Sequence, residues 1–272
     1  MTDKISASIV LFNTDYNQLL DVINSYCPSE KRSLFIIDNS KIQNADYSFS
    51  NHNIRYYFLG KNIGFGAAHN LAIKMAINEG SKYHLVLNPD LVFDSNIIDK
   101  INDYMDKNEN VVELMPRIVN ACNETQYLCK LLPTPFDLIL RRFMPMIPFF
   151  KKINDRYILK NCNYNEVLNV PSLSGCFMFL RLNVIKNNEL YFDESFFLYC
   201  EDLDLVRRLY RLGETVYYPE VSVVHIHARE SYKTTKMFLR HIYSAIKYFN
   251  KWGWFCDKER SIINRDVLSR YL

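Results

Sequence analysis

Short apolar runs alternate with stretches of helical spacing through the first third of the chain, and this alternation constrains the fold more than any other feature. Residues 15–26 have helical spacing, and residues 66–78 are a strong helix on propensity that ends near Gly80. The apolar runs around them have the composition of buried strands: residues 7–12, 33–37, 54–59 and 83–87. Strand, helix and strand at this pitch form a βαβ unit, so the pattern predicts an α/β fold around a parallel sheet.

The rest of the chain continues the alternation with one interruption. The further elements predicted are helices over 96–107, 201–212 and 231–250, and strands over 111–119, 172–181, 215–218 and 221–224. Residues 120–165 are the least regular part and contain prolines at 133, 135, 145 and 148. A segment of this length with its own apolar and basic content is more typical of a functional insert than of an idle loop.

The glycine content excludes two kinds of nucleotide site. The seven glycines leave neither a G-x-G-x-x-G fingerprint nor a G-x-x-x-x-G-K-[ST] loop, so a standard dinucleotide site and a P-loop are both excluded. The seven cysteines include no C-x-x-C pair, and most lie in apolar stretches. We interpret them as reduced thiols of a cytosolic protein rather than as zinc ligands or disulfide partners.

The apolar stretches are too short to target or cross a membrane. The one within residues 1–13 is shorter than the apolar core of a signal peptide. The longest, residues 136–150, is broken by Arg141, Arg142 and two prolines. A spanning helix needs roughly 20 apolar residues, so no membrane-crossing segment is predicted.

The net charge of +3 conceals a division along the chain. Residues 136–160 carry six Lys or Arg against two acidic residues, and residues 225–272 carry ten against four, which leaves a net charge of −7 on the remainder. Two basic, aromatic-rich segments on an acidic body favour an anionic partner, with a phospholipid surface as first candidate; no nucleic-acid partner is expected. Solvated helix faces explain the same charges equally well, so both interpretations stay open.

Three polar groups lie where predicted strands end or helices begin, the edge at which open α/β sheets place their ligands. Asp38 follows a buried strand, and residues 62–70 (NIGFGAAHN) open a helix whose N–H groups suit phosphate. Asp90 follows another strand, where a carboxylate suits Mg²⁺ or Mn²⁺. For each group an ordinary turn, helix cap or close helix contact is at least as good an explanation.

Two further groups are more unusual. Residues 201–204 place three carboxylates in the first turn of a predicted helix. The helix dipole explains one or two of them, but three repel one another, and such crowding is typical of a base or metal site. His225 and His227 alternate along a strand and share one face, so with Arg229 they suit a metal or a diphosphate, although a single histidine there would be read as a core residue.

Taken in order, these stretches resemble the family 2 glycosyltransferases with a GT-A fold, especially their bacterial rhamnosyltransferase-like branch. The resemblance spans nearly the whole chain, and its most specific part is FDESFFLYCEDLDLVRRL at residues 192–209. The other matching stretches are Phe12-Asn13, IIDNS (36–40), NIGFGAAHN (62–70), LNPD (87–90), SGCFMFLR (174–181) and PEVSVVHIHARES (219–231). The resemblance implies a Rossmann-like α/β fold whose mostly parallel central sheet is flanked by helices, with a C-terminal helical extension.

The resemblance also implies roles for individual residues. Asp202 would be the catalytic base, with Glu201 beside it, both at the N-terminus of a helix. Asp38 would read the nucleobase, while Asp90 and His225 would bind Mg²⁺ or Mn²⁺. Because Asn88 occupies the first acidic position of the family's D-x-D motif, dependence on metal is itself open. The remaining site residues are Phe12, Asn13, Asn62, Gly64 and Asn88 for the nucleotide sugar, Ser174, Gly175 and Tyr199 for the acceptor, and His227 and Arg229 for the diphosphate loop.

The implied activity is inverting, non-processive sugar transfer, since the Q-x-x-R-W motif of the processive synthases is absent. The expected donor is a nucleotide diphosphate sugar, with dTDP-rhamnose first and UDP-hexoses second. The expected acceptor is a glycan, lipid-linked, in cell-surface polysaccharide synthesis such as that of O-antigen. The expected location is the cytoplasm, peripheral on the inner face of the plasma membrane, and a homodimer is an open alternative to a monomer.

Two other functions compete with this one. A catalytically silent nucleotide-sugar-binding scaffold is motivated by Asn88, and the retained Asp202 argues against it. A nucleotidyltransferase would need a glycine-rich N-terminal loop with a basic residue, and residues 8–16 contain neither. The predicted division of the chain is a glycosyltransferase domain over 1–228, with a nucleotide-sugar half at 1–110, an acceptor half at 111–228 and an insert at about 120–165, followed by a basic, aromatic helical tail over 229–272.

Overall fold

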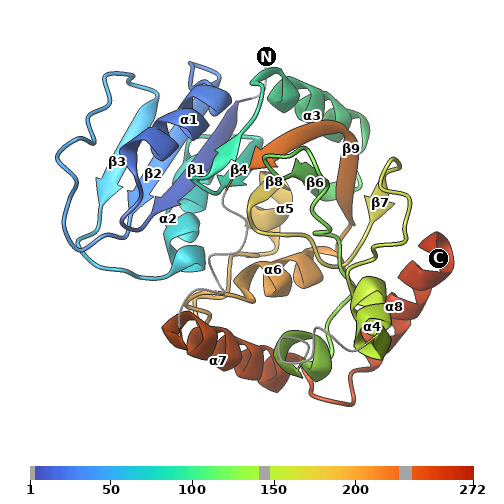
Figure 1. Cartoon of the computed structure of the whole chain (residues 1–272). Helices are drawn as coiled ribbons and strands as arrows, with labels where there is room; N and C mark the ends of the chain where they lie inside the picture. Colours follow the sequence, from blue (N-terminus) through green and yellow to red (C-terminus); the bar gives the residue numbers. More distant parts are fainter. Residues whose placement is uncertain (1–3, 141–147, 227–234) are drawn as a thin grey trace.

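The computed structural model describes residues 4–140, 148–226 and 235–272 (Figure 1). Over these residues, nine strands form one sheet in the order β3-β2-β1-β4-β8-β6-β9-β5, with β7 paired to β9. The strands are β1 (Ile5–Leu11), β2 (Arg32–Asp38), β3 (Ile54–Phe58), β4 (Tyr83–Leu87), β5 (Leu91–Val92), β6 (Val111–Val119), β7 (Leu168–Asn169), β8 (Phe177–Arg181) and β9 (Glu214–His225). Helices flank this sheet, so the predicted α/β fold is confirmed.

Strand directions bring distant parts of the chain to one edge of the sheet. Strands β3, β2, β1 and β4 are parallel, so β2 and β4 end at the same edge, at Asp38 and Leu87. Strand β8 runs antiparallel to β4 and begins there, with Phe177 opposite Leu87. Strand β9 also ends there, because it is parallel to β6, which is antiparallel to β8. The strand-end residues of the sequence motifs therefore meet at this edge.

Helices form where apolar spacing and end signals agree. Helix α1, for example, starts after Asp15, whose carboxylate accepts the Asn17 N–H at 2.9 Å and the Gln18 N–H at 3.2 Å. The helices are α1 (Tyr16–Tyr26), α2 (Phe65–Asn78), α3 (Asn96–Lys107), α4 (Pro148–Tyr157), α5 (Leu182–Asn187), α6 (Glu201–Leu209), α7 (Thr235–Trp252) and α8 (Lys258–Tyr271). A short π-helix, Phe136–Leu140, lies in the predicted insert.

Several bounds differ from those predicted. The strand expected at 172–181 begins only at Phe177, and the helix expected from 201 to 212 ends at Leu209. The two strands expected at 215–218 and 221–224 are one strand, β9. Its pairing with β6 shifts register between Pro116 and Arg117, so the chain bulges around Pro219 without leaving the sheet. The tail contains two helices, since α8 follows α7.

The apolar interior has two parts. A large cluster covers the sheet and includes side chains of β1, β2, β4, β6 and β8. A second, smaller cluster lies between α7 and the chain around the start of α6, and consists of Leu132, Phe196, Cys200, Leu203, Ala245, Tyr248 and Phe249. In Figure 1, α7 lies along the lower edge of the molecule below α6. The first helix of the tail therefore shares a core with the approach to α6.

Two expectations concern thiols and membrane segments. All seven cysteines are free, as predicted. Within the part of the chain that the structure describes, none of the helices combines the length and apolar character needed to span a bilayer.

Candidate active site

The first group of site residues lies where β1 and β2 end. Asp38 is fully buried, and its carboxylate accepts the Ser40 backbone N–H at 2.8 Å and the Tyr56 hydroxyl at 2.6 Å. Ser40 Oγ in turn accepts the backbone N–H of Asn13 at 2.9 Å. Burial and the bond to Asp38 raise the pKa of Tyr56, so its hydroxyl stays a hydrogen-bond donor. The predicted Asn13 and Asp38 are thus brought together, with the half-exposed Phe12 beside them.

The start of α2 joins this group through Gly64. Gly64 has φ +97°, and a Cβ there would lie 2.7 Å from the Phe197 carbonyl oxygen, so glycine is required. Its N–H donates to Asn62 Oδ1 at 2.9 Å, and its carbonyl oxygen accepts from Asn39 Nδ2 at 3.0 Å. The Phe65 N–H donates to the Phe197 carbonyl oxygen at 3.1 Å. Two of the N–H groups that the sequence offers to phosphate are therefore already bonded within the protein.

The second group lies where β4 and β9 end. Strand β5 follows Asp90 and pairs with β9 so that Leu91 is opposite His225. Asp90 Oδ2 consequently lies 3.1 Å from His225 Nε2, and both side chains are 12% exposed. Asp90 Oδ1 and His225 Nδ1 are buried without a hydrogen-bond partner. The two predicted metal ligands are therefore adjacent, and each has an atom without a hydrogen-bond partner that could coordinate a metal ion.

These two side chains fit a divalent cation that is shared with a substrate. Over the described residues, no three His, Cys, Asp or Glu side chains are grouped closely enough to hold a metal ion. Mg²⁺ is commonly held by one or two carboxylates together with substrate phosphates and water, rather than by an all-protein cage. Asp90 and His225 would supply the protein's part of such a shell.

Asp202 lies at the same edge and is oriented by two backbone groups. Its Oδ2 accepts the Gly175 N–H at 2.9 Å, and its Oδ1 accepts the Leu203 N–H at 2.8 Å. Gly175 lies just before β8, next to the half-buried Ser174. The neighbouring Cys176 accepts the Asn88 N–H through its carbonyl oxygen at 2.9 Å. The structure thus joins the predicted base to the predicted acceptor-side residues and to Asn88.

The thiol of Cys176 links this base to the metal pair. Burial is the main reason that the pKa of Cys176 is raised to about 12, and the negative charges of Asp90 and Asp202 act in the same direction. Both carboxylates therefore lie within electrostatic reach of one side chain. The candidate metal ligand and the candidate base belong to one site.

Two other carboxyl groups near Asp202 are buried. Glu201 is 4% exposed, and burial, followed by the charge of Asp202, raises its pKa well above the usual value. Glu113, on β6, is fully buried, and neither of its carboxyl oxygens has a hydrogen-bond partner. Burial and Asp202 raise the pKa of Glu113 in the same way. Asp202 is therefore the partly exposed member of this group, and Glu201 lies beneath the surface.

The approach to α6 is strained. Tyr199 and Cys200 have φ values of +72° and +65°, although neither is glycine. The left-handed conformation costs roughly 1–2 kcal/mol for each such residue. The Tyr199 ring lies 5.4 Å from that of His241 in α7, and the Cys200 side chain makes no capping bond to α6. Strain of this kind persists where surrounding contacts impose it, and it clusters at active sites.

Two predicted residues cannot be placed, and two residues of the site were not predicted. His227 and Arg229, predicted to face the diphosphate, lie outside the described residues. Tyr56 and Glu113 were not predicted as parts of the site. Tyr56 had no signal beyond its place in a strand, whereas a single glutamate in the apolar stretch 111–119 was a usable signal for a buried carboxyl group.

Two proteins of known function are similar to this chain in sequence. Rhamnosyltransferase WbbL of Escherichia coli K12 is 26% identical over 201 residues, which cover 71% of this chain and 72% of WbbL. The low-salt glycan biosynthesis hexosyltransferase Agl10 of Haloferax volcanii is 26% identical over 219 residues, which cover 78% of this chain and 63% of Agl10.

A solved structure shows the same fold. Staphylococcus aureus TarS superimposes with a TM-score of 0.60 at 15% identity, over 98% of this chain and 43% of TarS. Its 1–349 fragment in complex with UDP-GlcNAc gives a TM-score of 0.58 at 15% identity, over 98% of this chain and 72% of the fragment. The chain thus spans less than half of the TarS chain in that structure. The model of glycosyl transferase family 2 matches residues 6–189, well over half of the sequence, and the chain therefore belongs to this family of GT-A glycosyltransferases.

Proposed function

We propose that the protein transfers one sugar per encounter from a nucleotide diphosphate sugar to a hydroxyl group of a glycan, with inversion at the anomeric carbon. The observation that carries this proposal is the Asp202 carboxylate, which the Gly175 N–H orients at the sheet edge where Asp90 and His225 also meet. The absence of a Q-x-x-R-W motif supports transfer of a single sugar.

The proposed reaction requires one general base, held in position beside the acceptor hydroxyl. The acceptor oxygen forms a bond to the anomeric carbon while the bond from that carbon to the diphosphate oxygen breaks, and the hydroxyl proton passes to Asp202. A single displacement of this kind inverts the anomeric centre and needs no second, flanking carboxylate. Because Glu201 is buried with a raised pKa, we assign the proton transfer to Asp202 alone. A divalent cation held by Asp90 and His225 would stabilise the departing diphosphate.

Two donor classes are supported by relatives. The name of WbbL refers to rhamnose, so dTDP-rhamnose is our first choice. UDP-hexoses are the second choice, since Agl10 is named as a hexosyltransferase and TarS has been solved with UDP-GlcNAc. In both cases we assign the nucleotide to the edge formed by Asn13, Asp38 and Asn62. A lipid-linked acceptor in cell-surface polysaccharide synthesis remains part of the proposal.

Release of nucleoside diphosphate from a panel of donors tests the proposal. We expect release with one donor class, stimulated by a glycan acceptor, and a loss of at least about a hundredfold in Asp202→Asn, since general-base catalysis contributes roughly 10²–10⁴. Asp99→Asn, at an exposed carboxylate, is the matched control. Equal rates in wild type and Asp202→Asn would contradict the enzymatic role, and donor binding without release would favour the silent scaffold.

We further propose that α7 rests on the cytoplasmic leaflet that carries such an acceptor. Leu239, Tyr243 and Ile246 repeat along one face of α7 and are 61%, 59% and 38% exposed. The helix contains no acidic residue. Apolar side chains on an amphipathic, basic helix suit the boundary between headgroups and acyl chains.

Vesicle flotation tests this contact. We expect binding to vesicles with anionic lipid at low salt, and weaker binding for Leu239→Ser/Tyr243→Ser. Ile42→Ser, at a site 84% exposed in the N-terminal half, is the control. Wild-type protein that stays unbound would contradict membrane contact without affecting the proposed transfer.

A further inference from the structure

Helix α7 holds the segment that leads into α6. Ser244 Oγ donates to the Leu198 carbonyl oxygen at 2.7 Å, and Lys247 Nζ donates to the Ser195 carbonyl oxygen. Lys251 Nζ lies 2.7 Å from Asp193 Oδ2. Burial acts to raise the pKa of Asp193, but its hydrogen bonds with Lys251 and Ser195 outweigh burial and lower the pKa to about 2. One face of α7 therefore binds residues 193–198 at three successive places.

Helix α2 holds the same segment from the other side. Asn70 binds Phe192 in both directions, since its Nδ2 donates to the Phe192 carbonyl oxygen and its Oδ1 accepts the Phe192 N–H, each at 2.9 Å. The Phe65 N–H donates to the Phe197 carbonyl oxygen at 3.1 Å. Residues 192–198 are thus fixed between α2, which opens at the proposed donor side, and α7.

Helix α7 also binds the first turn of α6 directly. Asp204, two residues after the candidate base, is fully buried. Its carboxylate accepts Trp252 Nε1–H at 2.8 Å and Arg208 Nε–H at 2.8 Å, and Lys251 Nζ lies 2.8 Å from it. Lys251 therefore bridges Asp193, before the strained turn, and Asp204, after it.

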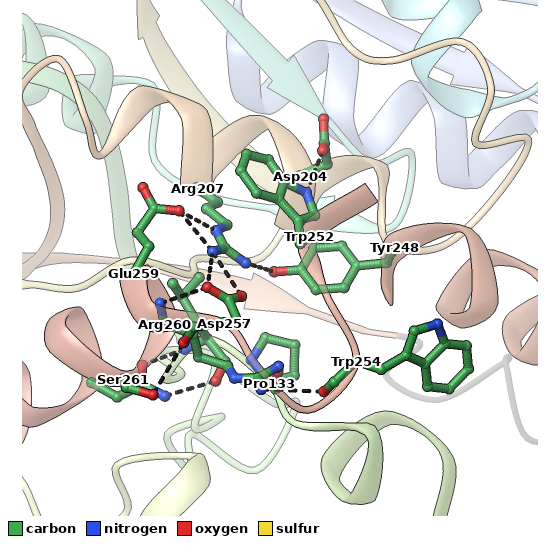
Figure 2. Close-up of polar contacts among 12 residues, drawn as sticks. Pro133, Asp204, Arg207, Tyr248, Trp252, Trp254, Asp257, Glu259, Arg260 and Ser261 are labelled. Atoms are coloured by element: carbon green, nitrogen blue, oxygen red, sulfur yellow. Dashed lines mark hydrogen bonds and ion pairs between the residues drawn. The ribbon is translucent and has the colours of Figure 1, made fainter. Parts of the chain in front are cut away.

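The Trp252 ring lies against Arg207 of α6, and Arg207 is bound in turn by Glu259 of α8, as Figure 2 shows. The Arg207 guanidinium lies 4.1 Å from the Trp252 ring centroid, and its side chain is 1% exposed. It pairs with Asp257 at 2.9 Å and with Glu259 at 2.7 Å, and it donates to the Tyr248 hydroxyl at 3.2 Å. The indole that reaches Asp204 therefore has little freedom to move.

These contacts replace the usual means of fixing a helix start. The N-cap residue Cys200 is left-handed and makes no side-chain cap bond, so α6 lacks the local cap that would define where its first turn lies. The position of Asp202 then depends on Gly175 on one side and on the bonds from α7 to Asp193 and Asp204 on the other.

We propose that Lys251 and Trp252 are positioning residues for the catalytic base: through Asp193 and Asp204 they hold the strained Tyr199–Cys200 turn and thereby place Asp202. This inference rests on the proposed function, since it takes Asp202 as the base. It assigns a task in transfer to α7, which follows the site motifs in the sequence.

The test compares Trp252→Phe with the same substitution at Trp254, two residues later. Trp252→Phe keeps an aromatic ring beside Arg207 but removes the N–H that binds Asp204, together with the second ring of the indole. Trp254→Phe is the matched control, because its indole N–H donates to the exposed Asn250 Oδ1 on α7 itself, at 2.9 Å. We expect kcat of Trp252→Phe to fall roughly ten- to a hundredfold, since misplacement of a catalytic group by about 1 Å costs that much. Donor KM and the melting temperature should match those of Trp254→Phe.

Lysine variants provide a second measurement. Lys251→Met removes the bridge between Asp193 and Asp204 and should lower kcat similarly, whereas Lys251→Arg can reach both carboxylates and should restore most of it. A kcat of Trp252→Phe equal to that of Trp254→Phe would overturn the inference. The inference would also be overturned if the loss of activity only matched a loss of folded protein, or if only the donor KM changed.

Hydrogen exchange separates this inference from the proposed function, because it requires no donor. We expect faster amide exchange in Trp252→Phe confined to residues around 199–204. Unchanged exchange there overturns the positioning role of Lys251 and Trp252. Faster exchange in a protein whose wild type releases nucleotide from no donor would support that role and refute the proposed transfer.

Discussion

The Gly175 N–H donates to Asp202 Oδ2 at 2.9 Å, so the candidate base is oriented by a backbone group 27 positions earlier in the chain. A Cβ at Gly175 would lie 2.9 Å from Asp202 Cβ and 3.3 Å from Oδ2. The absence of a side chain at residue 175 is therefore what allows the carboxylate to approach the start of β8.

Gly175→Ala should lower kcat by roughly a hundredfold because the new methyl group displaces the base. Gly80→Ala is the contrasting control, since Gly80 has φ +74° but no atom within 4 Å of an added Cβ. It should lose about 1 kcal/mol or more of stability and keep its kcat. Steady-state kinetics and urea unfolding of both variants provide the comparison, and unchanged turnover in Gly175→Ala would argue against the assigned position of the base.

Removal of divalent cations should abolish transfer, and Mg²⁺ or Mn²⁺ should restore it. Because Asp90 and His225 are the protein ligands in this proposal, His225→Asn should raise the Mn²⁺ concentration for half-maximal activity by roughly tenfold or more. Asp90→Asn should prevent recovery. Titration of Mn²⁺ by electron paramagnetic resonance, with nucleoside diphosphate present, measures the same site without turnover. Full activity in a chelator would mean that transfer here is independent of metal.

Two buried histidines predict that acid destabilises the fold. Ser8 Oγ lies 2.7 Å from both His69 Nδ1 and His84 Nε2. Burial lowers the pKa of His84 to about 3, and burial together with His84 lowers the pKa of His69 well below its usual value. Because the unfolded chain binds protons below about pH 6.5 and the folded chain does not, stability is complete above that pH and is lost as the pH falls toward 3.

The expected slope is about 1.4 kcal/mol per pH unit for each histidine, which amounts to about 2 kcal/mol at pH 5 for His84. Urea midpoints between pH 5 and 8 measure it. His84→Gln should flatten the dependence, and His52→Gln, at an exposed position, is the control. A wild-type midpoint that does not change below pH 6.5 would contradict the buried, neutral state of this pair.

Glu113 predicts the opposite dependence on pH. Burial and the charge of Asp202 raise its pKa, so the folded state keeps it neutral at pH values where the unfolded chain ionises it. Stability from this group is complete below about pH 4.5 and falls by about 1.4 kcal/mol per pH unit as the pH rises toward the raised pKa. Glu113→Gln should therefore be more stable than wild type at pH 8 and less distinct at pH 5. Glu109→Gln, at an exposed glutamate, should show no such gain in thermal unfolding.

Local patterns were sufficient for elements whose ends carry local signals. The predicted ranges 83–87, 96–107 and 111–119 coincide with β4, α3 and β6. They failed around Pro219, where two strands were predicted at 215–218 and 221–224, because the bulge that keeps them one strand depends on pairing with β6. They also failed to separate α8 from α7 within the predicted tail, because the position of α8 depends on distant contacts, such as that of Glu259 with Arg207 of α6.

The sequence by itself determined the order of strands and helices and the residue types that follow each strand, because hydrophobic periodicity and turn signals act over a few neighbouring residues. Tertiary structure decided which of these residues meet. Asp90 contacts His225 across 135 positions of the sequence, and Asp204 contacts Trp252 across 48. The first contact depends on the order of strands within the sheet, and the second depends on the packing of α7 against α6. Tertiary structure also decided that Glu113 and Glu201 are buried, with raised pKa values, while Asp202 stays partly exposed, because burial, rather than residue type, sets the cost of a charge.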